Sequence, residues 1–109
     1  MKIKSKIWIE KDGELVFGTG KSLILKAVDK AGSINKAARQ MNMSFRRAWS
    51  CIKAIEKRLG TPLLIIKKGG KHGGGAILTS YAKDLIKKFE KLENQVKNFV
   101  DKKYKDLFS

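Results

Sequence analysis

This chain of 109 residues has one cysteine, Cys51, one histidine, His72, and one proline, Pro62. A lone cysteine cannot form a disulfide within the chain, which fits a reducing compartment. One cysteine and one histidine are also too few for a structural zinc site or a convincing cysteine–histidine nucleophile pair. Because no paired carboxylates or metal cluster is apparent either, we expect no enzyme, no metal and no cofactor.

Long apolar runs are missing as well. No segment approaches the about 20 apolar residues that a membrane-spanning helix needs. The N-terminus is basic and alternates polar with apolar residues, so it does not have the pattern of a secretory signal. We therefore expect a cytoplasmic protein with no membrane partner.

Acidic residues are scarce where basic residues are concentrated. The chain has 25 Lys and Arg against 10 Asp and Glu, which gives a net charge of +15. Residues 30–79 alone contain eleven Lys or Arg and a single acid, Glu56, a local charge of +10. A Lys-rich thermostable surface would normally carry matching Glu. The imbalance therefore favours a polyanionic partner for one folded domain.

Residues 33–59 have the pattern of two helices joined by a tight turn. Ser33 and Ser44 are good N-caps, because a serine hydroxyl accepts a bond from an unpaired N–H group at the helix start. The sequence predicts helices over 34–42 and 45–59 that cross steeply as a helix-turn-helix. The first has an apolar stripe at helical spacing, made of Ile34, Ala37, Ala38 and Met41. The alternative is an ordinary two-helix corner with a solvated basic face.

The helix predicted over 45–59 has two different faces. Its inward face is expected to hold Phe45, Ala48, Trp49, Ile52 and Leu59, so the aromatic residues are interpreted as core and not as base-stacking groups. A recognition helix presents its N-terminal residues to the major groove, where arginine pairs bidentately with guanine. The residues expected to contact bases are Arg46, Arg47 and Ser50. Those expected to contact phosphates are Ser44, Lys36, Lys53, Lys57, Lys67, Lys68, Lys71 and His72.

The segments before this pair have simpler patterns. Alternation from Ile3 onward predicts a β-hairpin over 3–17, and apolar spacing predicts a helix over 21–31. The run Gly18 to Ser22 suggests a phosphate-binding loop. Its spacing is wrong, however, because Leu15 stands where that motif needs glycine.

Residues 63–78 are predicted to form a strand, a basic glycine-rich loop over 67–75 and a second strand. This is the layout of a DNA-binding wing, in which glycine allows close approach and lysine neutralises phosphates. A plain hairpin loop and a nest for a small oxyanion are the alternatives.

The last helix is predicted to span 80–109. At 1.5 Å per residue it would be about 40 Å long, which exceeds what a domain with a radius of gyration of about 13 Å can cover. Apolar residues spaced by three and four form a seam expected at a dimer interface, namely Leu85, Phe89, Leu92, Val96 and Phe99. The alternative is a helix that bends back onto the N-terminal hairpin.

Two segments of this sequence resemble the winged-helix N-terminal domain of ModE-type molybdate-responsive regulators, a relative of the LysR-type DNA-binding domain. They are GSINKAARQMNMSFRRAWSCIKAIEKRLG, at 32–60, and GGKHGGGAILT, at 69–79. The resemblance covers most of residues 1–95. It implies a homodimer that binds palindromic DNA through recognition helices and wings, with long helices at the dimer interface. Full ModE regulators continue into molybdate-binding modules and this chain stops at Ser109, so we do not expect it to bind molybdate.

The predicted fold class is α+β and mostly α. It is a winged helix-turn-helix over 1–79, with an N-terminal β-hairpin, and a long C-terminal dimerisation helix over 80–109 that belongs to the same domain. The predicted function is a sequence-specific regulator of transcription that binds double-stranded DNA as a homodimer, through the recognition helix 45–59 and the wing 67–75. The alternatives are a sequence-neutral architectural DNA- or RNA-binding protein and a module that docks an acidic partner protein.

Overall fold

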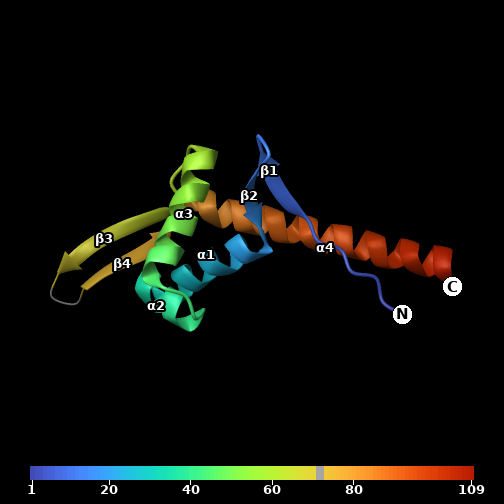
Figure 1. Cartoon of the computed structure of the whole chain (residues 1–109), viewed down its shortest axis with the longest axis horizontal. Helices are drawn as coiled ribbons and strands as arrows, with labels where there is room; N and C mark the ends of the chain where they lie inside the picture. The colour runs from blue at the N-terminus through green and yellow to red at the C-terminus, as the bar shows by residue number, and fades with distance from the viewer. Residues whose placement is uncertain (71–72) are drawn as a thin grey trace.

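The computed structural model describes residues 1–70 and 73–109. In chain order the elements are β1 (Trp8–Lys11), β2 (Glu14–Gly18), α1 (Thr19–Ala31), α2 (Ile34–Gln40), α3 (Phe45–Leu59), β3 (Leu64–Gly70), β4 (Gly73–Leu78) and α4 (Ser80–Phe108). In Figure 1, α1 to α3 form a compact body, the β3–β4 hairpin projects from one side, and α4 extends far past the other. No helix in the described part of the chain combines the length and apolarity needed to cross a membrane.

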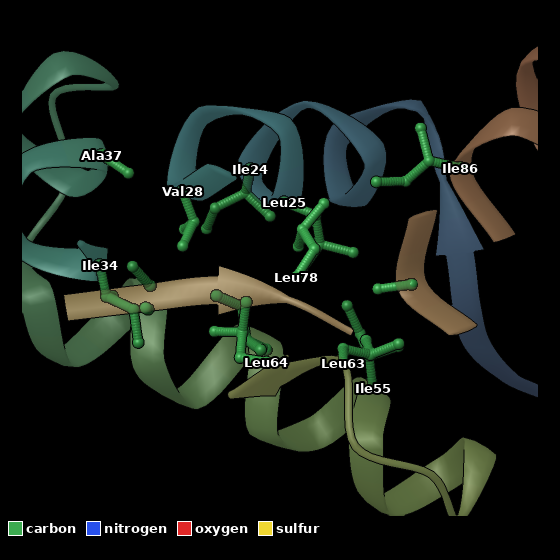
Figure 2. Close-up of a cluster of buried hydrophobic side chains, with 14 of the residues drawn as sticks. Ile24, Leu25, Val28, Ile34, Ala37, Ile55, Leu63, Leu64, Leu78 and Ile86 are labelled. Atoms are coloured by element: carbon green, nitrogen blue, oxygen red, sulfur yellow. The ribbon is translucent and has the colours of Figure 1, made fainter. Parts of the chain in front are cut away.

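One apolar core unites the helices and the hairpins. In Figure 2, Ile24, Leu25 and Val28 of α1 face Leu78 of β4, and Ile55 of α3 lies on the other side of this layer with Leu63 and Leu64. The rings of Phe17 on β2 and Phe89 on α4 meet edge to face, with their centroids 5.2 Å apart. Both rings are buried, so α4 is attached to the core through its first half.

The N-terminal hairpin is shorter than the alternation predicted. Strand β1 begins at Trp8, which pairs with Gly18 at the end of β2. Because the chain enters α1 at Thr19, residues 3–7 have no strand opposite them in this hairpin. The turn at Asp12 and Gly13 has positive φ at both residues, 54° and 80°, which is the geometry that matches the twist of a two-residue hairpin.

The helix ends carry the capping groups that the sequence indicated. The hydroxyls of Ser33 and Ser44 each accept a hydrogen bond of 3.1 Å, from the N–H groups of Lys36 and Arg47. Gly32 ends α1 in the left-handed region, with φ 80°, where a side chain would be strained.

Thr79 joins α4 to the rest of the fold. Its hydroxyl accepts a bond from Ala82 N and donates to Pro62 O, and its N–H donates to Leu63 O. From this junction α4 runs for 29 residues, or about 43 Å. The radius of gyration is therefore 16.6 Å, against about 13 Å for a compact domain of this length. The architecture is a winged helix-turn-helix, and the predicted fold class is confirmed.

Candidate nucleic-acid interface

Helices α2 and α3 are joined by a turn that fixes their relative position. Asn42 adopts a left-handed φ of 55°, and the N–H of Met43 donates to Ala38 O at 2.9 Å. Ala37, Ala38 and Ala48 are fully buried. Small side chains at these positions allow the helices to approach closely, so the N-terminal half of α3 has a defined place on the surface.

Helix α3 has a buried side and a basic side. Ala48, Ile52 and Ile55 are buried against the core. The opposite side is exposed, and at about 100° per residue one stripe of it contains Arg46, Ser50, Lys53 and Lys57. Two of the three residues predicted to contact bases, Arg46 and Ser50, therefore lie together near the start of this helix.

Arg47, the third predicted base contact, lies on a different side of α3. With Lys6, Trp8, Lys21 and Cys51 it lines a cavity of about 600 Å³ between α3, the start of α1 and the β1–β2 hairpin. Its side chain is exposed, but it flanks the stripe that begins at Arg46. The sequence interpretation grouped the two arginines as base contacts, although adjacent residues of a helix lie about 100° apart.

Glu56, the only acid between residues 30 and 79, is occupied by neighbouring groups. One carboxylate oxygen lies 3.1 Å from Lys53 Nζ. The other accepts the N–H groups of Leu63 at 2.7 Å and Leu64 at 3.3 Å. Its charge is therefore compensated locally, and the rest of the basic face keeps its positive potential.

The interpretation of Phe45 and Trp49 as core residues is wrong. Phe45 is 47% exposed and Trp49 is 36% exposed, whereas Ile52 is buried as expected. Ala48, Ile52 and Ile55 mark the centre of the buried side, and helical spacing places both aromatics at its edge, next to Arg46 and Lys53. Helical spacing relates the two aromatics to Ala48, Ile52 and Ile55, but the elements that pack against α3 determine which of these residues lie at the centre of the buried side.

The predicted phosphate contacts are spread over several elements. Lys36 is exposed in the first turn of α2, and Lys67 and Lys68 are exposed on β3. Ser44 lies at the start of α3, where its hydroxyl is used as the helix cap. Lys71 and His72 lie outside the described residues.

The wing hairpin is fixed to the helical body at its base. The N–H of Ala76 on β4 donates to Gly32 O, at the corner between α1 and α2, at 2.8 Å. A Cβ placed on Gly75 would lie 3.1 Å from the same carbonyl oxygen. The glycine-rich sequence therefore includes one position, Gly75, where glycine serves packing.

The predicted dimer seam on α4 divides into two parts. Phe89 is only 2% exposed and belongs to the core of its own chain, so its assignment to a dimer interface is corrected; Leu85 packs partly against the same core. Farther along, Leu92 is 46% exposed and Phe99 is 63% exposed, with Val96 half-buried. Apolar side chains that the sequence interpretation omitted, Leu107 and Phe108, are also exposed near the C-terminal end.

Two further kinds of arrangement concern the described residues, metal-binding clusters and ion pairs that would neutralise Arg46 and Arg47. Within residues 1–70 and 73–109, no three His, Cys, Asp or Glu side chains come together as a metal site. The ion pairs found there engage Lys26, Lys53, Arg58 and Lys88, so Arg46 and Arg47 are not among them. The exposed guanidinium groups are suited to an external anion.

Solved structures with this fold include DNA complexes. The CbnR DNA-binding domain–DNA complex aligns with a TM-score of 0.57 and 21% identity, covering 78% of this chain and 92% of that one. The BenM DNA-binding domain in complex with benA site 1 DNA aligns with a TM-score of 0.55 and 20% identity, covering 81% and 93%. At these identities the likeness concerns the fold alone.

Sequence relatives confirm the resemblance to ModE-type regulators. Transcriptional regulator ModE of Haemophilus influenzae is 41% identical over 70 residues, 64% of this chain and 28% of the relative. Molybdenum-pterin-binding protein MopB of Rhodobacter capsulatus is 33% identical over 90 residues, 83% and 33%. The chain thus spans about a third or less of these curated relatives. Residues 22–83 match the bacterial regulatory helix-turn-helix proteins of the lysR family, and this chain belongs to that family.

Proposed function

We propose that this chain is a sequence-specific transcriptional regulator that binds a palindromic site on double-stranded DNA as a homodimer. The observation that carries the proposal is the exposed basic stripe of α3. The acid next to this stripe, Glu56, is paired with Lys53. A helix of this charge fits the major groove between its phosphates. The role is one of binding and not of catalysis. The name of the H. influenzae relative, a transcriptional regulator, supports it.

In this proposal the interface residues have different roles. Arg46 and Ser50 contact base edges, because they lie together in the first turns of α3 and arginine recognises guanine bidentately. Arg47 acts at the border of the groove, where its side of the helix faces the hairpin. The phosphate contacts come from Ser44, Lys36, Lys53, Lys57, Lys67 and Lys68 and, on the sequence alone, from Lys71 and His72.

The dimer in this proposal is formed by the far half of α4. Leu92 and Phe99 expose apolar side chains along a helix that extends past its own core. A two-fold partner that uses the same patch would cover the exposed Leu92 and Phe99 side chains of both chains. Two α3 helices would then lie on one side of the duplex, about 34 Å apart or a multiple of this distance.

The net charge of +15 favours a second candidate, a sequence-neutral architectural DNA- or RNA-binding protein. Charge alone attracts any nucleic acid, whatever its sequence. A module that docks an acidic protein would depend on the same charge and is the third possibility.

Selection of bound sequences from random duplex DNA separates these functions. We expect a palindrome with fixed half-site spacing, bound about a thousandfold more tightly than scrambled duplex at one stated salt concentration. Equal affinity for both duplexes, or for RNA, would support the sequence-neutral protein. Displacement of the selected duplex by a lower concentration of polyglutamate than of scrambled DNA would support the protein-docking module.

A further inference from the structure

Helix α3 carries an aromatic stripe beside its basic stripe. The rings of Phe45 and Trp49 stack with centroids 6.0 Å apart and an interplanar angle of 24°. Lys53 continues the stripe by one more turn, and its Nζ lies 4.6 Å from the centroid of the Trp49 ring. Both aromatics are exposed although the adjacent Ala48 and Ile52 are buried. The single chain therefore leaves a preformed apolar surface facing outward.

This surface is part of the proposed DNA interface. Phe45, Trp49 and Lys53 are four residues apart and follow one line along α3, and Arg46 and Ser50 occupy the neighbouring line. A duplex that contacts Arg46 and Ser50 with its base edges therefore also lies against the two rings. The positive charges nearby, Arg46 on the neighbouring line and Lys53 at the C-terminal end of the stripe, favour a polyanion as the occupant of this patch over an apolar protein surface.

The major groove offers one kind of apolar group to such rings, the 5-methyl group of thymine. Stacking of an unpaired base is less compatible with the geometry. Phe45 and Lys53 already lie against the Trp49 ring from the preceding and following turns, so a base that stacks on Trp49 would have to displace one of them. A methyl group can contact the ring edges without any rearrangement.

We propose that Phe45 and Trp49 recognise thymine in each half-site through its 5-methyl group, and so determine part of the operator sequence. This inference rests on the proposed function, because it requires duplex DNA in contact with α3. The Lys53 ammonium lies 4.6 Å from the centroid of the Trp49 ring and 3.1 Å from the Glu56 carboxylate. The aromatic stripe is thus supported from its C-terminal end before DNA arrives.

The test replaces each thymine of the selected duplex, one at a time, with deoxyuridine, which removes only the methyl group. We expect one or two positions per half-site at which the substitution weakens binding by about fourfold, the value for one buried methyl-sized group. The same duplexes are then titrated with Phe45→Ala and Trp49→Ala proteins. At the sensitive positions these variants should bind thymine and uracil duplexes equally, because the contact is already lost.

Two variants serve as controls. Trp8→Ala removes the other tryptophan, which is exposed on β1, and should keep the full thymine preference. Lys68→Ala on β3 should weaken both duplexes by the same factor and also keep the preference. Thermal unfolding of all variants shows that they are folded, and the deoxyuridine series with the unmodified protein remains informative even if an aromatic variant fails to fold.

The outcomes separate this inference from the function on which it rests. If the unmodified protein binds its selected site but tolerates every deoxyuridine, the thymine inference is overturned and the regulator function stands. If it prefers single strands over the duplex, base stacking replaces methyl recognition. If no duplex is selected from random DNA, the proposed function itself fails.

Discussion

At the scale of single residues, Glu56 has two tasks that substitutions can separate. Its carboxylate accepts the backbone N–H groups of Leu63 and Leu64 and pairs with Lys53. Glu56→Ala leaves two N–H groups without this acceptor and should lower the free energy of unfolding by about 1–3 kcal/mol in urea denaturation. Glu56→Gln keeps an acceptor oxygen and should lose less. Both variants remove a negative charge from α3 and should bind DNA more tightly at low salt. Equal stability of all three proteins would contradict this assignment.

Arg46 and Lys68 should differ in how their removal affects DNA binding. Arg46→Ala should relax preference at one base pair of each half-site, at a cost of about 1–3 kcal/mol, because a base-edge contact is lost. Lys68→Ala should weaken all duplexes by a similar factor. Affinities for a set of single-base variants of the site measure both effects. A uniform loss for Arg46→Ala would mean that this side of α3 contacts only phosphates.

The helix-capping residues could be predicted from the sequence better than the exposure of the side chains. The N-caps Ser33 and Ser44 followed from local chemistry, since a cap depends on the next few residues only. The exposure of Phe45 and Trp49 could not be derived in the same way. It depends on which elements pack against α3, and helical spacing alone does not state where the core ends.

At the scale of elements, α4 is divided at about its middle. Phe89 packs on Phe17 in the core, while Leu92 and Phe99 expose their side chains. The length of this helix and its overrun of the core followed from heptad spacing, but the point where core contacts end did not. That point depends on the position of β2, a long-range contact that no local pattern contains.

A double substitution tests the function of the far half of α4. Leu92→Asp with Phe99→Asp should convert a dimer into a folded monomer, because four carboxylates would meet at the two-fold interface. Light scattering measures the mass, and circular dichroism measures the helix content. The control is Asp substitution at Lys97, which is exposed on the same helix. An unmodified protein that is monomeric at high micromolar concentration would refute the dimer.

The wing shows the same division between what a sequence pattern contains and what tertiary contacts add. Strand, glycine-rich loop and strand were evident from composition. The bond from Ala76 to Gly32 O, which fixes the hairpin to the α1–α2 corner, was not.

Gly75→Ala should disturb this attachment, because the new Cβ would lie 3.1 Å from a backbone oxygen. We expect a lower melting temperature and weaker DNA binding. Gly20→Ala, where a Cβ would meet no atom within 4 Å, should cause neither loss.

At the scale of the whole molecule, the net charge of +15 leads us to expect DNA binding that weakens as salt concentration rises. The logarithm of affinity should fall linearly with the logarithm of salt concentration, with a slope of about −0.9 for each phosphate neutralised. A titration from low to physiological salt gives this slope. Lys67→Ala and Lys68→Ala should each reduce it by about one. A flat dependence would exclude an electrostatic contribution from α3 and the wing.

Thr79 leaves little freedom for α4 to pivot, because its N–H and its hydroxyl hold the corner at Pro62 and Leu63 while the same hydroxyl caps the helix. In a dimer built on α4, the distance between the two α3 helices would then be set by the protein. One extra base pair between the half-sites would displace one of them by about 3.4 Å and rotate it by about 35°. If the dimer keeps this separation, the duplex would have to twist or bend to restore contact. The spacing between the half-sites would therefore define the operator as strictly as the base sequence of each half-site does.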